Sequence, residues 1–145
     1  MTKGIALLLS AFAGILVAMQ PPINSKLGAA VGTFAAATIS FLVGTVVLFA
    51  VAVLSGGTHL GGLRGVPWWY FVGGLIGAVF VASSLVTVRT LGAGGVVAAT
   101  IAGQLTGAAV IDQFGLLGLS KTPLSATRVV GIALLAVGVF LVVRK

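Results

Sequence analysis

Five long apolar runs, interrupted only by short polar segments, constrain this 145-residue chain more than any other feature. Each run is close to the roughly 20 mostly apolar residues that a helix needs to cross a bilayer core. The sequence therefore predicts an all-α membrane protein, with residues 1–145 forming a single transmembrane domain. We place its five transmembrane helices at residues 4–27, 34–54, 67–88, 92–114 and 123–143.

The composition excludes a soluble globular protein. Hydrophobic residues make up 59% of the chain and charged residues only 6%, against about 25% charged residues in average soluble domains. Such a chain has too little polar surface to cover a water-soluble fold. It contains no cysteine, one histidine (His59) and one acid (Asp112). We therefore expect no enzyme activity, no metal site and no cofactor.

The net charge of +7 does not indicate nucleic-acid binding. The basic residues occur mostly singly at the ends of apolar runs, where they anchor helices at lipid headgroups. A nucleic-acid site would need a clustered basic stripe. With five spans, each side of the membrane carries four basic residues: Lys3, Arg64, Lys121 and Arg128 on one side, Lys26, Arg89, Arg144 and Lys145 on the other.

This equal distribution of positive charge bears on topology. An excess of Lys and Arg on the cytoplasmic side normally sets the orientation of a membrane protein. A chain without that excess can insert in both directions and pair as an antiparallel homodimer, which forms an inverted repeat from two copies. A miscounted span or a missing terminal segment would explain the equal counts as well.

Small residues recur every four positions along several of the expected helices. Residues four apart share one helix face, and small side chains there let membrane helices approach closely. We expect these faces to pack helices together. The glycines concerned are Gly14, Gly44, Gly73, Gly77, Gly103 and Gly107.

Polar residues inside the apolar runs are the candidate substrate contacts. Pro21 and Pro22 lack an N–H, so they remove helical hydrogen bonds and predict a helix break within the first span. Gln20 and Asn24 lie on either side of the pair, four residues apart. Gln104 lies near the middle of the fourth span. Amides at membrane depth mark either interhelical hydrogen bonds or a substrate path, and we expect these three to face substrate.

The single acid, Asp112, lies near the C-terminal end of the fourth span, where the helix dipole disfavours a negative charge. It therefore needs a cationic partner. Arg128 would lie on the same side of the membrane within one chain, and Arg89 or Lys26 of a second copy would do so in an antiparallel dimer. Asp112 is either a structural ion pair or a residue that couples transport to an ion.

Several stretches resemble the YdcZ-type branch of the drug/metabolite transporter superfamily. They are VAMQPPINSKLG (residues 17–28), SFLVGT (40–45), GGLIGA (73–78) and AGQLTGAAVIDQFGLLG (102–118). The resemblance implies half of a ten-helix inverted-repeat transporter in the bacterial inner membrane, and a dual-topology pair of chains. It implies an exporter, and we expect export of a small molecule by alternating access around a shared midplane cavity.

One departure from related small multidrug transporters concerns the first span. Those proteins carry a glutamate there, whereas residues 5–19 contain no acid. Proton-coupled cation export by that route is therefore not supported. An uncharged or zwitterionic metabolite, or an anion drawn to Arg89 or Arg128, is as consistent with the sequence as a drug cation. A small ion channel, or a non-transporting assembly or lipid-handling partner, remains the alternative function.

Overall fold

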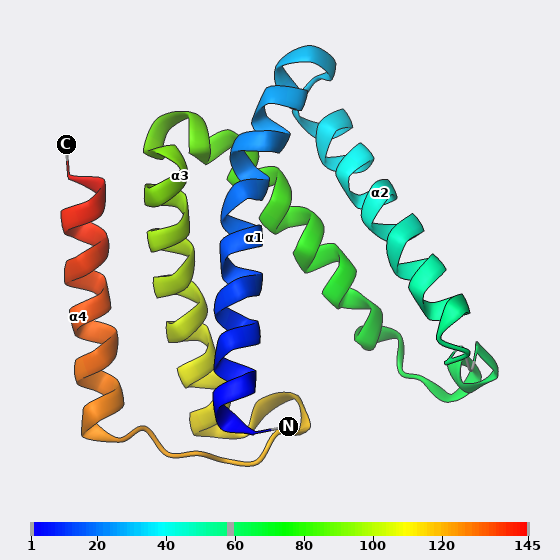
Figure 1. The fold of residues 1–145 in the computed structure, drawn as a ribbon. Helices are drawn as coiled ribbons and strands as arrows, with labels where there is room; N and C mark the ends of the chain where they lie inside the picture. The colour runs from blue at the N-terminus through cyan, green and yellow to red at the C-terminus, as the bar shows by residue number, and fades with distance from the viewer. Residues whose placement is uncertain (1, 58–59, 145) are drawn as a thin grey trace. The chain divides into compact units, whose positions relative to one another are not determined.

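The computed structural model describes residues 2–57 and 60–144, which leaves His59 and Lys145 outside the described residues. The described chain consists of helices and connecting loops (Figure 1). The four long helices are α1 (Lys3–Val31), α2 (Thr33–Leu54), α3 (Val72–Phe114) and α4 (Ala126–Val143). The chain divides into two compact units, Met1–Thr90 and Leu91–Lys145.

The helix α1 begins after Thr2, whose hydroxyl accepts a hydrogen bond from the Ile5 amide at 3.4 Å. It extends four residues beyond the predicted end at residue 27. Gly32, with φ of 91°, ends α1 and also precedes α2. A positive φ is readily adopted by glycine, so this one residue lets the chain reverse between two helices.

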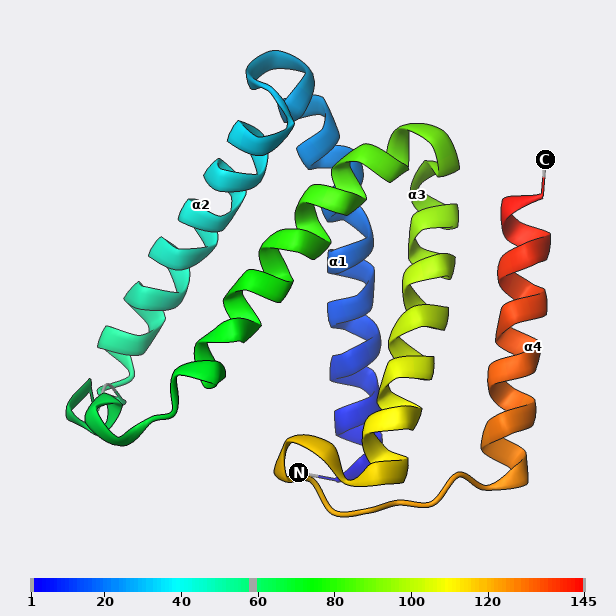
Figure 2. The same ribbon diagram turned by 180° about the vertical axis from the view of Figure 1, so that it is seen from behind.

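Pro21 and Pro22 both lie inside α1, which continues through them as predicted for the first span. Without their N–H groups the carbonyls of Val17 and Ala18 lose their helical partners. The second half of α1 leans away from the direction of the first half (Figures 1 and 2). The break at the prolines is therefore a bend with missing hydrogen bonds and not an interruption of the helix.

The buried core of the first unit is small. Leu85 and Ala36 are completely buried, and Val81 and Ala37 pack with them. Most other apolar side chains are exposed, including Phe34 at 79% and Leu54 at 87%. A water-soluble protein of this size would bury far more apolar surface. These faces suit contact with lipid or with other helices in a bilayer.

The helix α3 contains one non-helical residue, Gly92, with φ of 69° and ψ of 171°. We predict two separate spans here, at residues 67–88 and 92–114. The structure records a single element with a kink at Gly92, so it has four helices that are long and apolar enough to cross a membrane among the described residues. The fifth membrane crossing stays a prediction. It requires the α3 residues before Gly92 and those after it to cross the membrane as two separate helices.

Two short segments connect the long helices. The predicted loop at residues 55–66 includes η1 (Leu60–Gly65), and η2 (Trp68–Phe71) precedes α3. Pro67 caps η2, so α3 itself starts at Val72 and not at residue 67. After α3 the chain passes through Gly115 and η3 (Leu116–Gly118).

The last helix, α4, begins three residues later than predicted. Pro123, Leu124 and Ser125 precede it in non-helical conformation. The Ser125 hydroxyl caps its first turn by accepting a hydrogen bond from the Arg128 amide at 3.2 Å. An N-cap of this kind typically contributes about 1 kcal/mol, which accounts for the start at Ala126.

Candidate functional site

A small pocket lies in the first unit, against the middle of α2. Its volume is about 200 Å³. Its walls carry one amide and two hydroxyls among apolar and aromatic groups, and none of the lining residues is ionisable. These residues are Gln20, Ser40, Phe41, Gly44, Thr45, Leu48 and Val81. We name this cavity the polar pocket.

Gln20 supplies the largest polar group of the polar pocket. Its side chain is exposed, and no protein hydrogen bond to it occurs among the described residues. In a bilayer an amide without a partner is costly, because lipid tails cannot replace the hydrogen bonds of water. The amide therefore needs water, substrate or another helix.

Asn24, one turn further along α1, is in a different situation. It is only 5% exposed, and its Nδ2 donates a hydrogen bond to Ser40 Oγ at 3.1 Å. This contact ties α1 to α2 beside the polar pocket. Asn24 thus orients a lining residue, Ser40, while Gln20 lines the pocket itself.

Gln104, the third amide that we expect to face substrate, belongs to the second unit. Its side chain is exposed there. The hydroxyl of Thr106, two residues further along α3, donates a hydrogen bond to the Ala102 carbonyl of the same helix at 2.8 Å. Gln104 has no such local partner among the described residues, so its role in substrate contact remains a prediction.

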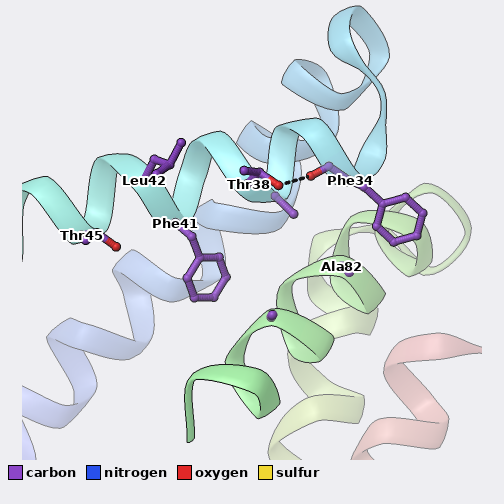
Figure 3. Close-up of a pocket in the computed structure, with 8 residues that line it drawn as sticks. Phe34, Thr38, Phe41, Leu42, Thr45 and Ala82 are labelled. Atoms are coloured by element: carbon purple, nitrogen blue, oxygen red, sulfur yellow. Dashed lines mark hydrogen bonds between the residues drawn. The ribbon is translucent and has the colours of Figure 1, made fainter. Parts of the chain in front are cut away.

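A larger, more apolar groove lies between α2 and the first part of α3, with a volume of about 340 Å³ (Figure 3). The Phe34 and Phe41 rings both extend from α2 toward α3, and Ala82 lies between them in this view. Phe41 and Thr45 line both cavities. The groove is lined by Phe34, Ala37, Thr38, Phe41, Leu42, Thr45, Ala78 and Ala82. We name it the apolar groove.

Gly77 lies beside the ring of Phe41, which lines both cavities. A Cβ placed there would touch Cζ of Phe41 at 3.4 Å, so a side chain larger than a methyl group would meet the ring. The other predicted packing glycines differ, since an added Cβ would meet no described atom within 4 Å. These open positions are Gly14, Gly44, Gly73, Gly103 and Gly107.

In the second unit the structure brings together two of the predicted charged residues. The Arg128 guanidinium donates a hydrogen bond to the Asp112 carboxylate. Both side chains are about 30% exposed, at 30% and 28% respectively. The neighbouring Gln113, which our sequence analysis missed, accepts a hydrogen bond from the Leu124 amide through Oε1 at 2.7 Å.

Arg89 is not paired with an acid among the described residues of its own unit. Its Nε donates to Ser25 Oγ at 3.4 Å, and its Nη2 donates to Thr33 Oγ1 at 3.5 Å. Gly28 lies beside the guanidinium, since a Cβ there would be in ordinary contact with Nη2 at 3.5 Å. Sequence reasoning assigned no contact with Arg89 to Ser25 or Thr33. Their contact with Arg89 depends on how α1, α2 and α3 pack, which the sequence pattern does not show.

The chain is similar to known membrane proteins. Residues 5–141 match the family described as "Putative inner membrane exporter, YdcZ". The curated relative "Inner membrane protein YdcZ" of Escherichia coli (strain K12) is 35% identical over 80 residues. That alignment covers 55% of this chain and 53% of the relative, so the match spans about half of the relative's length. No solved structure shows a significant match.

Proposed function

The chain belongs to the YdcZ family of inner membrane exporters and is a multi-pass protein of the bacterial inner membrane, and from this premise we propose that it exports a small, uncharged or zwitterionic amphipathic molecule. The substrate binds in the polar pocket. Gln20 and Thr45 hydrogen-bond to it, and the Phe41 ring packs against its apolar part. Ser40 contributes a hydroxyl that Asn24 holds in place.

The observation that carries this proposal is the chemistry of the polar pocket. An amide and two hydroxyls share a cavity of about 200 Å³ with an aromatic ring and no ionisable side chain. Ligand sites are typically apolar cavities with a few well-placed polar groups. A lining without charge favours a substrate without net charge, because an isolated ion would lose its hydration there without compensation.

We further propose that two copies work as an antiparallel homodimer. The four basic residues expected on each side support insertion in both orientations. The open positions at Gly73 and Gly103 support packing against a second copy. Gln104 would then find its partner, or substrate, at the dimer centre. Alternating access follows from exchange of two equivalent states, as in transporters built from inverted repeats.

The experiment that tests the site uses cells expressing the full chain. Small molecules in the medium and in the cells are quantified by mass spectrometry and compared with cells carrying an empty vector. Gln20→Leu removes the amide of the polar pocket, and Thr45→Val removes one of its two hydroxyls. Thr106→Val is the matched control, because that hydroxyl is already satisfied within its helix.

We expect at least one molecule without net charge to be enriched in the medium of wild-type cells. Both pocket variants should reduce that enrichment about tenfold, which corresponds to one or two lost hydrogen bonds. Thr106→Val should leave it unchanged. Enrichment that survives both pocket variants would place the substrate elsewhere, and no enrichment of any molecule would contradict export itself.

A further inference from the structure

Arg89, Ser25 and Thr33 form a cluster of polar side chains, which we name the Arg89 cluster. It lies outside the polar pocket and has no part in the proposed transport step. Arg89 extends from α3 to the second half of α1 and the start of α2, where it meets the hydroxyls of Ser25 and Thr33. Both hydrogen bonds are long, at 3.4 and 3.5 Å, and therefore weak. The only side-chain acid of the chain, Asp112, is paired with Arg128. The positive charge of Arg89 is thus available for an anion.

The cluster lies at one end of the apolar groove. Thr33, which contacts Arg89, directly precedes Phe34, which lines the groove. On α3 the groove residues Ala78 and Ala82 lie eleven and seven residues before Arg89. These spacings keep all three on one helix face. A cationic end and an apolar channel therefore form one continuous surface.

The groove has the length and lining of a channel for a hydrocarbon chain. From Phe34 to Thr45 it follows α2 over eleven residues, roughly 16 Å at 1.5 Å per residue. Its α3 wall consists of alanines, which leave a smooth surface. The Thr38 hydroxyl donates to the Phe34 carbonyl at 2.9 Å, so it offers no unpaired donor to an apolar occupant (Figure 3).

We propose that this surface binds an anionic phospholipid of the surrounding bilayer. The Arg89 guanidinium, together with the hydroxyls of Ser25 and Thr33, holds the phosphate. One acyl chain occupies the apolar groove between the Phe34 and Phe41 rings. Guanidinium groups match phosphate geometry and remain charged at all physiological pH values. Phe41 and Thr45 also line the polar pocket, so the acyl chain lies beside the substrate cavity.

The test is native mass spectrometry of the purified full-length protein with defined lipids. The probes are phosphatidylglycerol, phosphatidylcholine of the same acyl chains, and glycerol 3-phosphate, which has no chains. Arg89→Gln removes the charge, Arg89→Lys keeps it, and Ala82→Phe fills the groove. Arg64→Gln is the control, because Arg64 is an exposed cation of η1 with no contact to the groove.

We expect phosphatidylglycerol to be retained about fivefold more than phosphatidylcholine, which is the effect of one basic residue on an anionic lipid. Arg89→Gln should abolish this preference, whereas Arg89→Lys and Arg64→Gln should preserve it. Ala82→Phe should lower retention of both lipids several-fold. Thermal unfolding of each variant shows whether the fold is intact, and only variants that unfold like the wild type are compared.

Three results would overturn the proposal. The two lipids could bind equally to the wild type. Arg89→Gln could behave as Arg64→Gln does. Glycerol 3-phosphate could displace phosphatidylglycerol at equal concentration, which would show that a soluble phosphate is the ligand and that the groove adds nothing. None of these results would bear on export through the polar pocket, since that assay reads flux of uncharged molecules.

Discussion

Arg128, in the first turn of α4, donates a hydrogen bond to the carboxylate of Asp112, in the last turn of α3. Each charge is at the helix end where the dipole opposes it, an acid near a C-terminus and a cation near an N-terminus. The pair therefore removes two unfavourable interactions at once. It also joins the two helices of the second unit across the loop at residues 115–125.

This ion pair predicts that neutralising one partner lowers the free energy of unfolding more than neutralising both partners does. Asp112→Asn and Arg128→Gln should each lower the free energy of unfolding by about 1 kcal/mol, because both side chains are partly exposed. The double variant should recover most of that loss, since no unpaired charge remains. Thermal unfolding in detergent over a double-mutant cycle measures the coupling. Additive losses would instead show that the two residues act independently.

The same set of variants also shows whether Asp112 serves only the ion pair or also couples transport to an ion. If the residue serves only the ion pair, the double variant should export as well as the wild type. The readout is the flux of the molecule identified by the medium comparison. A double variant that is stable but inactive would assign Asp112 to coupling, as the sequence allows.

Gln113 should hold the loop between α3 and α4 in place. Its Oε1 accepts a hydrogen bond from the Leu124 amide at 2.7 Å, next to a bond from the Thr122 amide to the Asp112 carbonyl. Gln113→Leu should cost about 1 kcal/mol and speed hydrogen exchange at Leu124 about fivefold. Gln113→Glu keeps the acceptor and serves as the control. Unchanged exchange in Gln113→Leu would mean that the backbone alone fixes the loop.

Ser40 should be more important for stability than the other hydroxyls of α2. Ser40→Ala leaves the buried Asn24 amide without its partner, which should lower the unfolding free energy by about 1 kcal/mol. Thr38→Ala is the control, because its hydroxyl bonds only to its own helix. Thermal unfolding compares the two. Equal effects would argue against an interhelical role for Asn24.

Gly77 should tolerate no large side chain. Gly77→Leu would push the Phe41 ring, which approaches an added Cβ to 3.4 Å, and overpacking of this kind costs about 1–3 kcal/mol. Gly131→Leu in α4 is the control, because nothing described lies within 4 Å of an added Cβ there. Thermal unfolding should rank Gly77→Leu well below Gly131→Leu. The reverse order would show that Phe41 moves aside freely.

The dimer proposal predicts two orientations of one chain. The sequence contains no cysteine, so single variants Thr2→Cys and Lys145→Cys can be labelled from outside intact cells with a membrane-impermeant maleimide. We expect partial labelling at both sites. A cysteine placed at Arg64 provides a third position on the N-terminal side. Complete labelling at one terminus and none at the other would exclude the symmetric antiparallel pair.

Much of the architecture follows from the sequence because it depends on local physics. Apolar length and scarcity of charge predict long membrane helices, although the sequence predicts five where the described residues form four. The resemblance of residues 17–28 and 102–118 identifies the family that residues 5–141 match. Helix ends were predicted less well. Residues 28–31 remain helical, and Pro123 stays outside α4, because capping by Gly32 and Ser125 decides these ends.

The sequence by itself determined that this chain belongs in a bilayer, since no arrangement of such residues could cover itself with polar surface. It also singled out Gln20 and Asn24 as a pair. Only the tertiary structure separated them, burying Asn24 against Ser40 and leaving Gln20 on a pocket. It likewise brought Arg89 to Ser25 and Thr33. Such contacts join residues 16 to 64 positions apart, and they depend on how helices pack, which periodicity along one helix does not encode.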